Sequence, residues 1–202
     1  TPDRLEASKE VATQFISGRP TDRIGLVVFS GESFTQCPLT TDHAVLINLF
    51  KDLKCGMLAD GTAIGMGLAT AVTRLKDSDA KSKVIILLTA GVNNTGSVAP
   101  ITAAEIAKTF GIRVYTIGVG TMGKALAPVM TNFGMQFDYV PVEIDEPMMK
   151  EIASQTGGKY FRATDNTKLK LIYYEIDKLE KSKIEYTDFT KRSDEYFILL
   201  LL

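Results

Sequence analysis

Apolar and polar positions along the chain alternate between a helical period and the unbroken apolar runs of buried strands. The clearest runs are residues 24–29 and 83–89, each bounded by turn residues, as is typical of strands that are covered on both faces. Around them, apolar residues recur at intervals of three and four, which predicts amphipathic helices. Helices are expected at residues 3–17, 42–54, 62–75, 102–110, 147–156 and 167–184.

Alternation of such strands and helices predicts the α/β class: a doubly wound, mostly parallel sheet with helices on both faces. Strands at 113–119 and 160–163 continue the series, and a more polar strand at 33–39 is expected at an antiparallel edge. The irregular segment 121–145 is expected to hold a hairpin around 133–142. The chain opens on a helix, so the first central strand is missing, which would leave two rows of buried backbone groups without partners.

The C-terminal end combines a charged stretch with a uniformly apolar one. Residues 1–190 are predicted to form one domain, and 191–202 a juxtamembrane segment with the start of a truncated transmembrane helix. Residues 197–202 are too few to cross a bilayer, which needs about 20 residues. Two alternatives stay open: a last buried strand, or a substitute for the missing central strand, in cis or from a second molecule.

Composition narrows the function classes. The 202 residues are 45% hydrophobic and 23% charged with net charge −1, which fits a soluble globular domain and offers no basic surface for nucleic acid. Cys37 and Cys55 match no zinc or redox spacing, so they are either a disulfide or, as we favour, buried free thiols. The one histidine, His43, follows the expected capping residue Asp42, where a surface role at a helix start is the simplest interpretation.

In an open parallel sheet, ligands bind outside the carboxyl ends of the strands. The segments expected there are 30–32, 60–62, 89–94 and 118–120. Their glycines, hydroxyls, amides and carboxylates make this edge the candidate binding surface.

Several of these runs resemble a known family, the von Willebrand factor A domain. Residues 84–89, followed by Gly-Val-Asn-Asn at 91–94, resemble its fourth strand and metal loop, 60–62 its threonine loop, and 22–29 its second strand. Further runs at 4–7, 34–42 and 141–146 resemble the BatA-type aerotolerance proteins of bacteria, which are membrane-anchored members of the family. The resemblance implies a Rossmann-like fold and a domain on the periplasmic side of the bacterial inner membrane.

The resemblance also implies a metal-ion-dependent adhesion site for Mg²⁺. The family builds it from a DxSxS motif, a threonine and an aspartate, whose hard oxygen ligands suit this cation. The threonine matches Thr62, but Ala90 occupies the aspartate position and no DxSxS segment is present. We therefore expect Mg²⁺ to be absent or weakly bound in this chain. For Thr62 in this chain we favour a helix N-cap, in which the hydroxyl accepts a hydrogen bond from a free backbone N–H, over the metal ligation that the resemblance implies.

The family implies recognition of another protein, such as a subunit of a related membrane complex, with the membrane reached through segments that flank this chain. The residues expected to contact the partner are Ser30, Glu32, Asp60, Asn93 and Asn94. The irregular segment 121–145 is a second candidate surface, because long insertions in compact domains are often functional.

A nucleotide site is the rival hypothesis. Gly118, Gly120 and Gly123 match G-x-G-x-x-G directly after a strand, but the fingerprint also needs a helix that opens at the third glycine. Pro128 interrupts the segment that follows. No G-x-S-x-G motif is present and no base lies near either cysteine in sequence, so the chain is not expected to be an enzyme.

Overall fold

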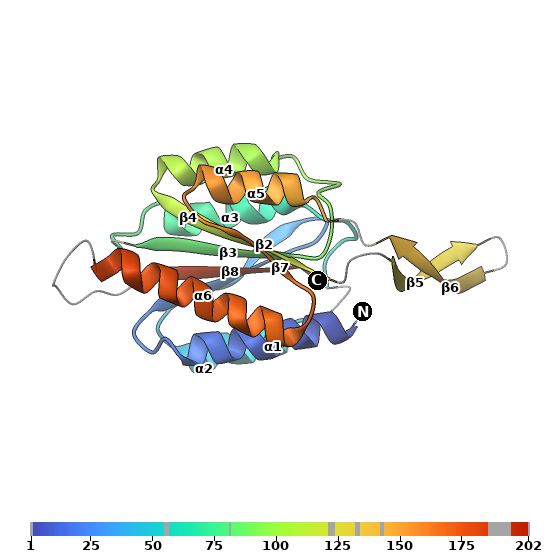
Figure 1. Ribbon diagram of the computed structural model, residues 1–202, viewed down its shortest axis with the longest axis horizontal. Coiled ribbons are helices and arrows are strands. Elements are labelled where there is room, and N and C mark those ends of the chain that lie inside the picture. Colours follow the sequence, from blue (N-terminus) through green and yellow to red (C-terminus); the bar gives the residue numbers. More distant parts are fainter. Residues whose placement is uncertain are drawn as a thin grey trace.

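The chain folds into a six-stranded sheet between two layers of helices, with a separate two-stranded hairpin at one end (Figure 1). The computed structural model describes residues 2–54, 57–80, 82–120, 124–131, 134–141, 144–185 and 195–201. Helices α1, α2 and α6 cover one face of the sheet, and α3, α4 and α5 cover the other. The doubly wound α/β class predicted from the sequence is confirmed.

The expected helices and strands are all present, with ends that differ by a few residues. The helices are α1 (Pro2–Ser17), α2 (His43–Lys51), α3 (Ile64–Leu75), α4 (Pro100–Thr109), α5 (Glu146–Gln155) and α6 (Asn166–Glu185). The strands are β1 (Arg23–Phe29), β2 (Ser33–Thr40), β3 (Lys83–Thr89), β4 (Ile112–Val119), β5 (Lys124–Thr131), β6 (Gly134–Pro141), β7 (Tyr160–Ala163) and β8 (Glu195–Leu201). The hairpin β5–β6 is longer than expected.

Strands of the main sheet lie in the order β2-β1-β8-β3-β4-β7. Strand β2 pairs antiparallel with β1 at one edge, as its polar pattern predicts, and every other pair is parallel. None of the helices in the described ranges is long and apolar enough to cross a bilayer.

Strand β8, which contains most of the apolar C-terminal stretch, occupies the centre of this sheet. Strand β8 lies between β1 and β3 and runs parallel to both, with Phe197 opposite Gly25 on one side and Ile85 on the other. The expectation that residues 191–202 begin a helix is therefore corrected for 195–201, which form the substitute strand in cis. The physical reason is that a central gap offers backbone partners on both sides, and these would otherwise stay buried and unpaired.

The core consists of two apolar clusters, one on each face of the sheet, and the strands supply both. In β3, Val84, Ile86 and Leu88 belong to the cluster that contains residues of α1, α2 and α6, whereas Ile85 and Leu87 belong to the cluster that contains residues of α3, α4 and α5. This period of two explains why the strand is apolar at every interior position.

A buried ionic network holds α6 at the end of the sheet where β3 and β4 begin. The Glu180 side chain is fully buried and accepts hydrogen bonds from Arg113, from Tyr115 at 2.5 Å and from Ser82 at 3.2 Å. Burial, reinforced by the hydrogen bond to Glu180 and its negative charge, raises the pKa of Tyr115, so this hydroxyl stays a donor. Four groups, from β4, α6 and the loop that precedes β3, thus satisfy one another away from water.

Candidate functional site

Three loops meet at the carboxyl edge of the sheet, where the sequence predicts a binding surface. They follow β1 (residues 30–32), precede α3 (57–63) and follow β3 (90–99). The Gly31 N–H donates to the Ala59 carbonyl and the Ala63 N–H donates to the Ser30 carbonyl, both at 2.7 Å. Backbone hydrogen bonds therefore hold the first two loops against each other.

Two glycines permit this close approach. A Cβ at Gly31 would lie 2.5 Å from the Asp60 carbonyl oxygen, which is shorter than any real contact. Gly61 has a φ of +130° and a Cβ there would meet the Thr95 methyl at 2.7 Å. Any side chain at either position would push the loops apart.

The third loop is attached through its two asparagines. The Asn94 Oδ1 accepts from the Thr62 N–H at 2.8 Å, and the Asn94 N–H donates to the Thr62 carbonyl at 3.0 Å. The Asn93 Oδ1 accepts from Gly65 N–H at 3.3 Å, in the first turn of α3. The N-cap residue of α3 is Ala63, which has no side-chain cap. The expected N-cap role of Thr62 is therefore wrong: Asn93 supplies the acceptor from a distant loop.

The Thr62 hydroxyl lies beside Gly91, the residue that follows Ala90. A Cβ at Gly91 would lie 3.1 Å from Thr62 Oγ1. No hydrogen bond reaches this hydroxyl within the part of the chain that the structure describes. The fold thus brings together the threonine loop and the loop that carries Ala90, as the resemblance implies.

The oxygen atoms at this edge do not form a metal site. Ala90 has no side-chain oxygen, and the amide oxygens of Asn93 and Asn94 already accept backbone hydrogen bonds. Among the described residues, no three His, Cys, Asp or Glu side chains gather where they could hold a metal ion. Mg²⁺ prefers six oxygen ligands in octahedral geometry, and the residues present do not fit it.

The residues expected to contact a partner divide into two groups. Ser30 is buried, and its hydroxyl donates to the Gly61 carbonyl at 3.0 Å, so it holds the loops together. Glu32, Asp60 and Asn94 are exposed. Neither the Glu32 nor the Asp60 carboxylate has an ion-pair partner among the described residues. The exposed group leaves two carboxylates facing solvent at the same edge.

The rival nucleotide site is not supported. After Gly120 the next described element is strand β5, not a helix whose N-terminus could face a pyrophosphate, and Gly123 lies outside the described residues. Gly118 has a packing role, because a Cβ there would lie 3.0 Å from the Tyr160 hydroxyl. The presence of glycine at position 118 therefore has a structural explanation.

The two remaining reactive side chains have structural surroundings. Cys37 is a buried free thiol, and burial, together with the charge of Asp42, raises its pKa. Cys55 lies outside the described residues. The half-buried His43 ring places Nε2 2.8 Å from the Asp22 carbonyl oxygen, to which it donates.

This fold and this loop edge define a class, the doubly wound α/β domains that bind ligands beyond the carboxyl ends of their strands. A family model described as the von Willebrand factor type A domain matches residues 2–175. The chain belongs to this family.

Solved structures narrow the comparison. An aerotolerance-related membrane protein from Bacteroides fragilis is 25% identical with a TM-score of 0.75, and covers 89% of this chain and of its own. BatB from Bacteroides thetaiotaomicron, described as a conserved hypothetical protein, is 28% identical with a TM-score of 0.73, over 88% of this chain and 89% of its own. These likenesses agree with the resemblance to the aerotolerance proteins.

A curated relative of unknown function extends the comparison in sequence. An uncharacterized protein from Borreliella burgdorferi is 29% identical over 99% of this chain and 59% of its own length. The chain thus spans little more than half of this relative.

Proposed function

We propose that this domain recognises another protein through the three-loop edge, as part of a membrane-associated protein of the aerotolerance-related group. The observation that carries the proposal is a set of polar groups that have no partner among the described residues: the half-buried Thr62 hydroxyl and the exposed carboxylates of Glu32 and Asp60. Loops on a rigid scaffold are the usual place for recognition. Binding, without a chemical step, is the role that these groups support.

The charge of this edge indicates the chemistry of the partner. A metal at such a site would receive a carboxylate from the partner, but with Ala90 and the engaged asparagines the described residues offer no complete ligand set for Mg²⁺. Without the metal, Glu32 and Asp60 make the edge acidic. An arginine or lysine side chain of the partner complements it, with charge-assisted hydrogen bonds to the carboxylates.

The attachment of the whole protein is a further part of the proposal. We expect it to be anchored in the bacterial inner membrane, with this domain on the periplasmic side. Support comes from the resemblance to the BatA-type proteins and from the description of one structural neighbour as a membrane protein. Labelling of an introduced surface cysteine by a membrane-impermeant reagent in intact spheroplasts tests the side; labelling only after lysis would contradict it.

A photo-crosslinking amino acid at Asn94 tests the binding edge in cells of the source organism. We expect one discrete protein adduct from this position, and loss of that adduct when Asp60→Lys reverses the local charge. The matched control places the crosslinker at Glu151, an exposed residue of α5. An equal adduct from both positions, or one that Asp60→Lys leaves intact, would show that this edge is not the recognition surface.

The metal is tested separately by melting. Millimolar Mg²⁺ should leave the melting temperature of this chain unchanged, because a ligand stabilises a fold only when it binds the native state. Ala90→Asp together with an upstream DxSxS segment should make the melting temperature depend on Mg²⁺. A shift already present with Ala90 would show that other oxygens hold the ion.

A further inference from the structure

A second candidate binding site lies on the helical face of the domain, between α1 and α6. The structure has a pocket of about 180 Å³ there, open to solvent. Its walls include Phe15 and Gly18 at the end of α1, and Lys170, Tyr173 and Tyr174 of α6. The pocket shares no residue with the three-loop edge.

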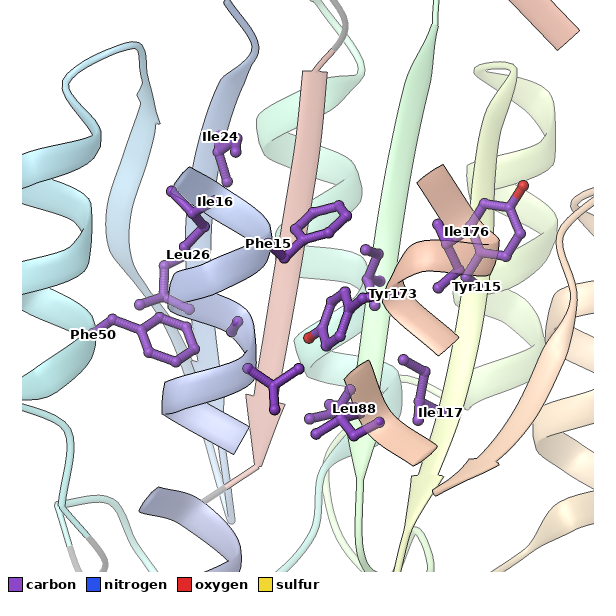
Figure 2. Packing of buried hydrophobic residues seen from close by; sticks show 14 of the residues in the cluster. Phe15, Ile16, Ile24, Leu26, Phe50, Leu88, Tyr115, Ile117, Tyr173 and Ile176 are labelled. Atoms are coloured by element: carbon purple, nitrogen blue, oxygen red, sulfur yellow. The ribbon is translucent and has the colours of Figure 1, made fainter. Parts of the chain in front are cut away.

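The residues that line the pocket include Phe15 and Tyr173, whose aromatic rings are in contact. The rings of Phe15 and Tyr173 lie side by side, with centroids 4.8 Å apart (Figure 2). Tyr173 is only 3% exposed, and its hydroxyl has no hydrogen-bond partner among the described residues. A buried hydroxyl without a partner destabilises the fold, so a ligand that supplies an acceptor removes this penalty.

The rim adds an apolar platform and a free cation. Tyr174, which lines the pocket, is 70% exposed, and Leu171, on the same helix but outside the pocket lining, is 61% exposed. Exposed large apolar side chains that adjoin a pocket are typical of interaction sites. Lys170 is exposed and forms no ion pair within the described ranges. The other cation at the pocket, Arg19, is already paired with Asp177 at 2.9 Å. Lys170 is therefore the cation that remains available to a ligand.

We propose that this pocket anchors one aromatic or branched apolar side chain from an acidic segment of a partner protein. The volume suffices, since an apolar cavity of about 150 Å³ binds benzene. The Tyr173 hydroxyl donates to a backbone carbonyl of that segment, and Lys170 pairs with its carboxylate. Leu171 and Tyr174 extend the apolar contact beyond the pocket.

Short peptides provide the probe. Acetyl-Glu-Phe-Glu-amide should bind with a dissociation constant of about 1 mM, a value in keeping with a single anchor. In ¹H–¹⁵N NMR spectra, it should shift the amide signals of Gly18 and Tyr174. The peptide with alanine in place of phenylalanine, and the one with lysines in place of both glutamates, should bind at least fivefold more weakly. Equal binding of all three peptides would overturn the proposal.

Variants locate the binding in the pocket. A Cβ at Gly18 meets only ordinary contacts, the nearest at 3.5 Å, so Gly18→Leu should fold normally, fill the pocket and abolish binding. Lys170→Glu should weaken binding, whereas Lys178→Glu, exposed on the same helix but outside the pocket, should not. Unchanged affinity in the folded Gly18→Leu variant would place the peptide elsewhere.

The Tyr173→Phe variant separates a binding role from a structural one. Removal of an unpartnered buried hydroxyl should leave the melting temperature equal or higher, while peptide affinity falls about threefold to tenfold. A lower melting temperature with unchanged affinity would assign the hydroxyl a purely structural role and contradict the proposal. Asp60→Lys should leave peptide binding intact, so failure at the three-loop edge and failure here are distinguishable.

Discussion

Polar side chains at the two ends of the central sheet have opposite surroundings: those at one end are buried and paired, and those at the other end are exposed. Where β3 and β4 begin, the Glu180 carboxylate is fully buried, and Arg113 and Tyr115 donate to it. Where β1 and β3 end, backbone and amide hydrogen bonds join the loops, and the Glu32 and Asp60 carboxylates are exposed and have no ion-pair partner in the described ranges. Side chains that are satisfied inside the fold hold it together, whereas those left unpaired at the surface are available to a partner.

The largest expected effect is at the buried end. Glu180→Ala removes the carboxylate to which Arg113 and the Tyr115 hydroxyl donate. The free energy of unfolding should fall by about 3–5 kcal/mol, as is usual when one partner of a buried ion pair is removed. Urea unfolding measures it. In the control Glu175→Ala, the ion pair with Lys159 lies at the surface, and the loss should be at most about 1 kcal/mol. Equal losses would remove the contrast between the two kinds of ion pair.

The second-largest loss of stability is expected from a change in the packing of the three loops. Gly31→Ala places a Cβ 2.5 Å from the Asp60 carbonyl oxygen, so the backbone must shift. We expect a loss of about 1–3 kcal/mol, together with weaker crosslinking at the loop edge. Gly18→Ala is the matched control, because its Cβ meets nothing closer than 3.5 Å, and it should change stability by less than about 1 kcal/mol. A neutral Gly31→Ala variant would mean that the loops are held less tightly than these distances indicate.

The cap supplied by Asn93 gives a smaller effect. Asn93→Ala removes the acceptor for the Gly65 N–H at the start of α3. Loss of a helix cap destabilises proteins by about 0.5–2 kcal/mol, which chemical denaturation can resolve. Asn48→Ala, exposed on α2, should stay within about 0.5 kcal/mol of the parent chain. If both substitutions behave alike, Asn93 does not act as the cap.

The smallest effect concerns an ion pair at the surface. Glu146 lies 3.1 Å from both Lys150 and Arg162, and the Lys150 hydrogen bond is the main cause that lowers its pKa from 4.5. Because the folded pKa is depressed, this stabilisation is full above the unfolded value and is lost as the pH falls through the folded value. Glu146→Gln should cost at most about 1 kcal/mol at neutral pH.

Melting temperatures across the acid range check this pH dependence. The difference between Glu146→Gln and the parent chain should shrink as the pH falls and vanish below the folded pKa. A difference that stays constant with pH would show that the substitution acts through packing and not through charge.

Local patterns account for most of the fold. Helices and strands follow from apolar periods, and the Asp42 cap of α2 follows from a residue three positions before its donor, Val45. The place of the three loops at one edge follows from the parallel pairing of β1, β8 and β3. The family resemblance located Thr62 and Ala90 within this edge.

Other features depend on partners far apart in the chain. The Asn93 cap joins residues 28 positions apart, and the bond from Tyr115 to Glu180 joins residues 65 apart. Sequence patterns show that such residues are polar, but not which donor or acceptor each will meet. The pocket between α1 and α6 was missed for the same reason: the periodicity of each helix indicates an apolar face, not an incomplete fit between two helices.

The apolar C-terminal stretch, residues 197–202, shows most clearly the difference between what local patterns determine and what distant partners determine. Its composition by itself predicts that residues 197–202 avoid water, and it is compatible with a helix or a strand. Only the tertiary structure decides that 195–201 form a strand, since the gap between β1 and β3 offers backbone partners on both sides. Burial is a property of the segment, whereas secondary structure depends on what lies next to it.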